Sequence, residues 1–178
     1  MKKFGLIGYP LGHSFSQKYF DAKFSKENIA GCSYDNFPLS SLDSFPDLIA
    51  ANPDLCGLNV TIPYKADILK YVDETDHIVR EIGAANVLKI RREGGKPRIY
   101  AYNSDVVGIR DSVLPFFPGK HGTALVLGTG GASKAVSWTL KNMGFIVVIV
   151  SRNKKEGILG YEEINAHLLN NISLIVNA

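Results

Sequence analysis

The sequence predicts an α/β protein of two domains, residues 1–104 and residues 105–178. Three observations lead to this prediction. Short apolar segments alternate with segments of helical periodicity along the whole chain, which is the pattern of α/β folds. Two prolines and a glycine within residues 114–119 stop one helical segment and separate two such series. The length of 178 residues is enough for two small domains.

The first strand and the first helix follow from the N-terminal residues. The apolar residues 4–7 predict a strand, which a glycine and a proline end. Aromatic side chains at helical spacing predict a helix over residues 17–27, and either Ser14 or Ser16 could cap it. The first domain therefore opens with a βα unit.

The rest of the first domain continues this alternation. We expect strands at 33–37, 55–61, 85–90 and 98–102, and helices at 42–51, 65–71 and 75–82. Pro63 closes the strand 55–61. Residues 93–96, Glu-Gly-Gly-Lys, predict a hairpin turn between the last two strands. The first domain is thus expected to be a mixed α/β unit.

The second domain opens with a helical stretch after Asp105 and continues as a βαβ series. We expect strands at 123–127, 145–150 and 172–176, and helices at 133–143 and 161–170. The first two of these strands are continuous apolar runs, which suit a parallel sheet covered on both faces.

This series corresponds to one half of a doubly wound, Rossmann-like sheet, in which the strands of a second half flank the first strand of the first half. Because only one half is present, we expect the strand 123–127 to have an unpaired edge and the domain to be incomplete at the C-terminus of this chain. The alternative is a complete three-stranded domain that is closed by dimerisation.

Composition and charge exclude several classes of protein. Hydrophobic residues make up 46% of the chain and charged residues 21%, so the chain can form a packed core. The longest apolar run, residues 145–150, is far shorter than the ~20 residues of a membrane-spanning helix. A net charge of +3 from scattered residues argues against nucleic-acid binding. We therefore expect a small-molecule partner and neither nucleic acid nor membrane, in a monomer or homodimer.

Location and metal content follow from the same inspection. The N-terminal residues lack the apolar stretch of an export signal, and Cys32 and Cys56 form no CxxC motif. We expect a cytoplasmic protein without a disulfide framework. The four histidines have no spacing typical of metal ligands, so no metal site is expected.

A glycine-rich turn predicts a dinucleotide site in the second domain. Its residues are Gly128, Thr129, Gly130, Gly131, Ala132 and Ser133, and they stand between a predicted strand and a predicted helix. Such glycines permit a tight turn, and they let a pyrophosphate approach the N–H groups at the start of the helix. Ser133 replaces the third glycine of the GxGxxG motif. A tight turn without a ligand is the alternative.

Basic residues follow the second strand of this domain. The segment is Ser151, Arg152, Asn153, Lys154 and Lys155, where an NAD-binding site usually has a carboxylate for the ribose 2′-hydroxyl. Arg152 has a planar guanidinium that suits the 2′-phosphate of NADP. The segment therefore favours NADP as the cofactor, with a solvated basic turn as the alternative.

Polar residues follow several strands of the first domain. Ser14 and Ser16 place two hydroxyl groups in a loop before a helix, which suits a carboxylate, although helix capping is the simpler explanation for this pair alone. Further polar residues stand at strand ends or just beyond them: Asn59, Thr61, Lys65, Asn86, Asn103 and Asp105. Because so many occur in one small domain, they indicate a polyhydroxylated ligand.

Five ordered motifs of this chain resemble those of the shikimate dehydrogenase family. They are GYPLGHSFS at 8–16, NVTIPYK at 59–65, GAAN at 83–86, NSDVVG at 103–108 and GTGGAS at 128–133. The resemblance covers nearly the whole chain. It implies a substrate-binding and catalytic domain, residues 1–104, followed by an NADP-binding domain, residues 105–178.

The resemblance also implies roles for individual residues. Ser14 and Ser16 would hold the substrate carboxylate, and Lys65 with Asp105 would form the catalytic pair. Substrate contacts would come from Asn59, Thr61, Lys65, Asn86 and Asp105. Cofactor contacts would come from residues 128–133 and from Ser151, Arg152, Asn153 and Lys155. One departure is Glu156, which stands where family members often carry a second arginine.

The implied reaction is the reversible reduction of 3-dehydroshikimate to shikimate with NADPH, a step of chorismate and aromatic amino acid biosynthesis. Two alternatives remain. One is a quinate/shikimate dehydrogenase that uses NAD, which the absence of an acidic residue directly after Val150 disfavours. The other is a regulatory homologue that binds shikimate without turnover. The presence of both Lys65 and Asp105 disfavours this second alternative.

Overall fold

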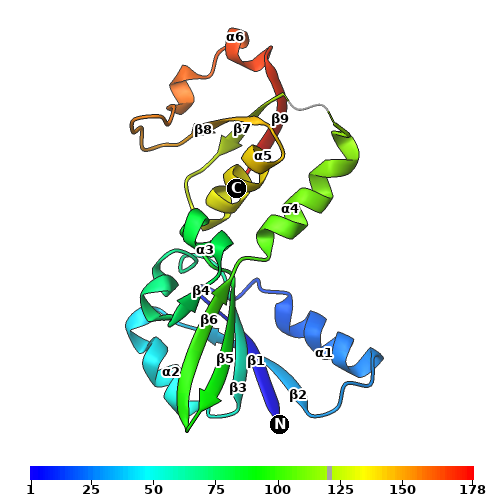
Figure 1. Ribbon diagram of the computed structural model, residues 1–178, viewed down its shortest axis with the longest axis vertical. Coiled ribbons are helices and arrows are strands. Elements are labelled where there is room, and N and C mark those ends of the chain that lie inside the picture. Colours follow the sequence, from blue (N-terminus) through cyan, green and yellow to red (C-terminus); the bar gives the residue numbers. More distant parts are fainter. Residues whose placement is uncertain (120–121) are drawn as a thin grey trace. The chain divides into compact units, whose positions relative to one another are not determined.

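The computed structural model describes residues 1–119 and 122–178, and the chain forms two compact α/β units (Figure 1). The first unit is Met1–Asn103 and the second is Ser104–Ala178. Each unit combines helices with its own sheet, so the α/β fold class predicted from the sequence is confirmed.

The first unit contains a six-stranded mixed sheet with the order β2-β1-β3-β5-β6-β4. The strands are β1 (Lys2–Gly8), β2 (Cys32–Pro38), β3 (Leu55–Val60), β4 (Glu74–Thr75), β5 (Val87–Glu93) and β6 (Lys96–Tyr102). The strands β1, β2 and β3 are parallel, whereas β5 runs antiparallel to both β3 and β6. The expected hairpin turn lies between Glu93 and Lys96, which pair with each other.

Helices cover both faces of this sheet, and Figure 1 shows α1 (Ser16–Lys26) and α2 (Phe45–Ala51) on opposite sides of it. Under α1, Leu6 and Tyr34 form a small aromatic core with partly buried phenylalanines. The larger core lies on the other face and includes Ile7 and Phe45. Because neighbouring strand residues point to opposite faces, Leu6 and Ile7 belong to different cores.

Several expected helices of the first unit differ in the structure. Residues 65–71 do not form an α-helix: a turn over residues 62–66, which contains Pro63, leads into a 3₁₀ segment, η2 (Asp67–Tyr71). The helix 42–51 begins as a 3₁₀ turn, η1 (Leu42–Ser44). The helix 75–82 shortens to α3 (His77–Ile82) because the short strand β4 occupies Glu74–Thr75 and Asp76 caps the helix.

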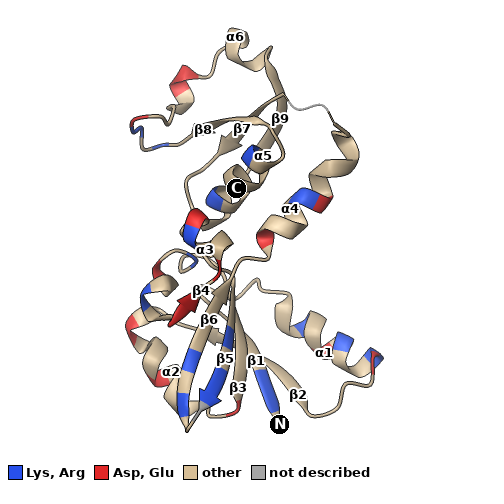
Figure 2. Cartoon of the chain, viewed as in Figure 1, with Lys and Arg blue, Asp and Glu red and all other residues tan. Residues whose placement is uncertain are grey.

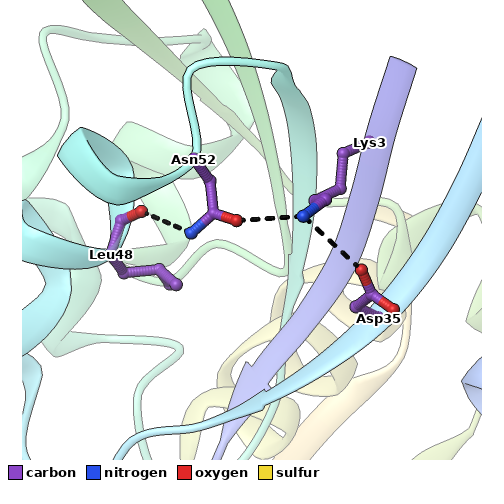
Figure 3. A network of polar contacts seen from close by, with 4 residues as sticks. All are labelled: Lys3, Asp35, Leu48 and Asn52. Carbon is purple, nitrogen blue, oxygen red and sulfur yellow. Dashed lines mark hydrogen bonds and ion pairs between the residues drawn. The ribbon is translucent and has the colours of Figure 1, made fainter. Parts of the chain in front are cut away.

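A polar network joins three elements near the N-terminal ends of β1 and β2 (Figure 3). Lys3 Nζ donates a hydrogen bond to Asn52 Oδ1 at 3.1 Å and lies 3.9 Å from Asp35 Oδ2. Asn52 Nδ2 in turn donates to the Leu48 carbonyl in α2 at 2.9 Å. These contacts fix β1 and β2 relative to the C-terminus of α2, at the edge of the sheet opposite to the carboxyl ends of the strands.

The second unit contains the parallel sheet expected from its apolar strands, in the order β8-β7-β9. Its elements are α4 (Asp105–Val113), η3 (Leu114–Phe116), β7 (Thr123–Leu127), α5 (Gly131–Asn142), β8 (Ile146–Val150), η4 (Tyr161–Glu163), α6 (Ala166–Leu169) and β9 (Ile172–Asn177). Val126 of β7 and Leu140 of α5 lie in one core with partly buried residues of α4.

The prediction of an unpaired edge on strand 123–127 is wrong, because β7 is the central strand of the sheet. The strand β9 crosses over and pairs with β7 along the side opposite β8, from Thr123 to Leu127. Consequently, the buried residues of β7 have hydrogen-bonded neighbours on both sides.

The prediction of one helix over 161–170 is also wrong. The segment divides into η4 and α6 because Ile164 adopts extended backbone and Asn165 starts a new helix by accepting the N–H of Leu168. Among the helices of the described part of the chain, none has the length and apolar character of a bilayer-spanning segment.

Candidate functional site

Polar residues of the first unit gather at the edge of the sheet where β1 and β3 end. The two strands are parallel, so the loops that follow them leave the sheet on the same side. Strand β5 is antiparallel and starts there, with Val87 opposite Asn59. The sequence-predicted residues Ser14, Thr61 and Asn86 therefore lie in three segments that meet at one edge. In open α/β sheets, ligand sites lie at such carboxyl ends of the strands.

The loop after β1 forms a cavity of about 520 Å³ whose lining includes Ser14, Ser16 and Thr61. The N-cap of α1 is Phe15, which makes no capping hydrogen bond through its side chain. Ser14 Oγ accepts the N–H of Ser16 at 3.3 Å. Two hydroxyl groups and the positive end of an 11-residue helix thus border one cavity, which is an arrangement that favours an anion.

Asn59 is not one of the residues that line this cavity. Its side chain lines a second cavity of about 520 Å³, mainly apolar, together with Tyr34 and residues of α1, β3 and β5. Asn59 Oδ1 accepts a hydrogen bond from the Tyr34 hydroxyl at 2.8 Å. Burial raises the pKa of Tyr34 to about 12, and a side-chain hydrogen bond with Ser16 acts in the opposite direction. Tyr34 therefore connects the loop after β1, which carries Ser14 and Ser16 and is called the serine loop below, to Asn59.

Tyr34 is a residue that the sequence-based site prediction missed. The sequence predicts the strand 33–37, but nothing in it distinguishes Tyr34 from a core aromatic residue. Its position in the strand is the feature that could identify it. Because β2 runs parallel to β1, Tyr34 lies on the same α1-covered face of the sheet as Leu6. A tyrosine hydroxyl on the face that α1 covers indicates a hydrogen-bond partner beneath that helix.

Backbone hydrogen bonds hold Lys65 and Asn86 at the same edge. The Ala85 N–H donates to the Lys65 carbonyl at 2.7 Å, and the Val60 N–H donates to the Asn86 carbonyl at 2.9 Å. Asn86 is 9% exposed, and Lys65 is half-buried. The segment that carries Lys65 is therefore fixed next to the strand that carries Asn86.

Asn103 and Asp105 fall in different units. Asn103 is buried in the first unit and its side-chain amide donates to the Ala84 carbonyl at 2.9 Å. Asp105 is the first residue of α4 in the second unit and is half-buried. Its pairing with Lys65 stays a prediction.

The glycine-rich turn of the second unit has the backbone geometry that its sequence predicts. Gly128 has a φ of +120°, which favours glycine, and its N–H donates to the Val150 carbonyl at 2.8 Å. Helix α5 begins at Gly131 with Gly130 as N-cap. Ser133 is buried and its hydroxyl donates to the Ala178 carbonyl at 3.0 Å. The first-turn N–H groups of α5 remain as donors for an anion.

The basic residues after β8 lie in a loop whose two ends are joined by backbone hydrogen bonds. The Ser151 N–H donates to the Leu159 carbonyl, and the Leu159 N–H donates to the Ile149 carbonyl, both at 2.9 Å. Figure 2 shows basic residues in this loop and acidic residues in η4. Lys154 Nζ lies 2.9 Å from Glu163 Oε1, an ion pair that lowers the pKa of Glu163. Arg152 and Lys155 are exposed, with no ion pair to another described residue.

The chain is similar to known proteins over most of its length. A family model described as the shikimate dehydrogenase substrate binding domain matches residues 6–88. The shikimate dehydrogenase (NADP(+)) of Ignicoccus hospitalis is 38% identical over 146 residues, which is 82% of this chain and 53% of that protein.

Solved structures agree with this similarity. The crystal structure of shikimate dehydrogenase 1 from Peptoclostridium difficile is 33% identical with a TM-score of 0.79, covering 100% of this chain and 66% of that one. The enzyme from Thermus thermophilus in complex with NADP(H) and shikimate is 26% identical with a TM-score of 0.81, covering 100% and 68%.

The matches cover only part of the relatives. The chain spans between 52% and 60% of the length of the curated relatives that it matches. All of the motifs at 8–16, 59–65, 83–86, 103–108 and 128–133 lie in residues that the structure describes. On the matched domain and the identity to curated relatives, the chain belongs to the shikimate dehydrogenase family.

Proposed function

We propose that this protein interconverts 3-dehydroshikimate and shikimate with NADP as the cofactor. The observation that carries the proposal is the cavity beside α1, in which Ser14, Ser16 and Thr61 meet. A carboxylate fits the serine hydroxyls and the helix N-terminus, and the amide and ammonium groups near that edge suit the hydroxyl groups of a ring. The first unit is then the substrate domain and the second unit the cofactor domain.

The second unit has groups that fit NADP. The N–H groups at the start of α5 suit a pyrophosphate, and Arg152 with Lys155 suits a 2′-phosphate. Lys154 is less suited because Glu163 already holds its ammonium group. When bound, NADPH supplies the hydride that reduces the ketone.

The chain's own residues have to bind, orient and protonate the substrate. Ser14 and Ser16 hold the carboxylate, while Asn59, Thr61 and Asn86 contact hydroxyl groups and fix the position of the ring. Lys65 donates a hydrogen bond to the ketone oxygen and assists in delivering its proton. In this proposal the carboxylate of Asp105 orients the Lys65 ammonium group and one ring hydroxyl.

Binding and turnover of shikimate test the proposal. Calorimetric titration of the protein should show shikimate binding, and Ser16→Ala should weaken it by about 10- to 150-fold, as expected for loss of a hydrogen bond to a charged group. Ser25→Ala is the matched control, because Ser25 lies in the same helix at its exposed C-terminal end.

Each contrary result has a definite meaning. No binding of shikimate by the parent protein contradicts the proposal. Turnover of shikimate with NADP would contradict the regulatory alternative. Oxidation of quinate and shikimate with NAD at least as fast as with NADP supports the quinate/shikimate dehydrogenase alternative.

A further inference from the structure

We propose that Tyr34 is a positioning residue of the ligand site, whose hydroxyl orients the Asn59 side-chain amide so that its NH₂ group faces the ligand. The proposal rests on the proposed function, because it takes Asn59 to be a substrate contact. Neither the motifs nor the family match singles out Tyr34.

The hydrogen bond between the two side chains crosses the strand that separates them. Tyr34 is paired with Phe4, and Asn59 is paired with Leu6, both on β1. All four side chains lie on the same face, since paired residues of parallel strands share a face and Phe4 and Leu6 are two positions apart. Tyr34 thus reaches diagonally over β1 to place its hydroxyl 2.8 Å from Asn59 Oδ1.

The tyrosine ring is held in one position. Tyr34 is 3% exposed, and the ring of Phe20 in α1 stacks on it with a centroid distance of 4.4 Å and an interplanar angle of 14°. The hydrogen bond to Asn59 is therefore anchored to a packed aromatic pair. Burial also keeps the phenol protonated, since the pKa of Tyr34 is raised to about 12.

The direction of this hydrogen bond determines what Asn59 can recognise. A phenol has one proton to donate, and here it is directed to the amide oxygen of Asn59. This bond uses one of the two lone pairs of the oxygen and turns the oxygen toward Tyr34, so the NH₂ group is the end of the amide that points away from Tyr34. Asn59 then acts as a donor and selects an acceptor oxygen on the ligand. Without the tyrosine hydroxyl, the amide can turn and offer either end.

Tyr34 is also connected to the carboxylate side of the site. Its hydrogen bond with Ser16 opposes the effect of burial on its pKa, and Ser16 lines the cavity beside α1. One buried hydroxyl therefore lies between the residue proposed for the carboxylate and the residue proposed for a ring hydroxyl.

A double-mutant cycle separates positioning from general stabilisation. Tyr34→Phe keeps the ring and removes only the hydroxyl, so shikimate binding should weaken by about 3- to 10-fold, the range of one net hydrogen bond. In the Asn59→Ala background the same change should alter binding by less than about twofold. Tyr64→Phe is the matched control, because it removes another buried hydroxyl that donates to the Leu39 carbonyl at 2.6 Å.

A measurement on the parent protein keeps the test independent of how the variants fold. In ¹⁵N-labelled protein, the side-chain NH₂ signals of Asn59 should shift when shikimate is added. Those of Asn52 should not, because its amide is held by Leu48 in the network at the other edge of the sheet. Unchanged Asn59 signals in protein that binds shikimate would overturn the proposal, as would additive effects in the double variant.

The same data distinguish this inference from the proposed function. If the parent binds shikimate and Tyr34→Phe binds it equally well, only the role of Tyr34 is wrong. If the parent binds no shikimate at all, the proposed function fails and the inference fails with it.

Discussion

Lys65 is the residue on which the chemistry of the proposed reaction depends most. Its backbone is bound to Ala85, next to Asn86, and its side chain is half-buried at the polar edge of the sheet. A lysine whose backbone is fixed in this way can bring its ammonium group to a ketone oxygen in a defined geometry, whereas a mobile surface lysine contributes little to such a geometry.

Replacing Lys65 by Ala should lower kcat by ~10² to 10⁴, the usual contribution of a general acid, and should change shikimate affinity little. Steady-state kinetics with shikimate and NADP measure this effect. Lys70→Ala is the control, because Lys70 is exposed on η2 and paired with Asp67. A kcat within threefold of the parent would remove Lys65 from the mechanism.

Arg152 and Lys154 should differ in their importance for the cofactor although they are two positions apart. Arg152→Ala should weaken NADP binding by ~1.5 to 3 kcal/mol, which is typical of a hydrogen bond to a charged group. Lys154→Ala should have a smaller effect because Glu163 already pairs with Lys154. Titration of each variant with NADP and NAD measures the difference. Equal affinity of the parent for the two cofactors would contradict this role of Arg152.

Tyr34 should make the protein sensitive to alkaline pH. Its pKa rises from 10.0 to about 12 on folding, so above pH 10 the unfolded chain loses the phenol proton while the folded protein keeps it. The free energy of unfolding should therefore fall between pH 10 and pH 12, by at most about 1.4 kcal/mol per pH unit from this group. Urea unfolding at several pH values should give a smaller decrease in Tyr34→Phe. An equal decrease in both proteins would contradict this.

At the scale of elements, periodicity and turn residues predicted the strands well. The expected strands 4–7, 33–37 and 55–61 correspond to β1, β2 and β3. The first and the third are mainly apolar segments that a proline follows, a pattern with few alternatives. Short helical segments such as η2 were predicted less well. Their form depends on turns and caps, and a cap residue such as Asn165 was not distinguished from a helical residue.

The order of strands in the second unit was not accessible from local patterns. Nothing in the residues 172–176 shows that this strand pairs with β7 on the side opposite β8, since strand order depends on tertiary packing and not on local sequence. The candidate site was predicted better than this sheet order. Its polar residues stand at the ends of strands, and these ends can be recognised in the sequence. Tyr34 lies within a strand, where the sequence gives no such indication.

The β5–β6 hairpin offers a test of local turn chemistry. Gly94 and Gly95 have φ angles of +61° and +83°, so both lie in the left-handed region. Gly95→Ala should lower the free energy of unfolding by about 1 to 2 kcal/mol, the cost of a left-handed alanine. Gly94→Asn should cost less, because asparagine tolerates this conformation. Thermal or urea unfolding measures both variants, and an equal loss in the two would contradict the turn assignment.

At the scale of the whole molecule, the two units are proposed to bind different ligands. The first unit matches a substrate-binding domain, and the second has the strand–turn–helix arrangement of a dinucleotide site. The chain spans between 52% and 60% of its curated relatives, so binding is a more direct measure of these assignments than turnover.

Chemical-shift mapping with each ligand tests this division most directly. Shikimate added to ¹⁵N-labelled protein should shift the amide signals of Ser14, Ser16, Thr61 and Asn86. NADP should instead shift those of the turn at residues 128–133 and of Arg152. Shikimate shifts that are absent, or that fall on the glycine-rich turn and spare the serine loop, would contradict the account.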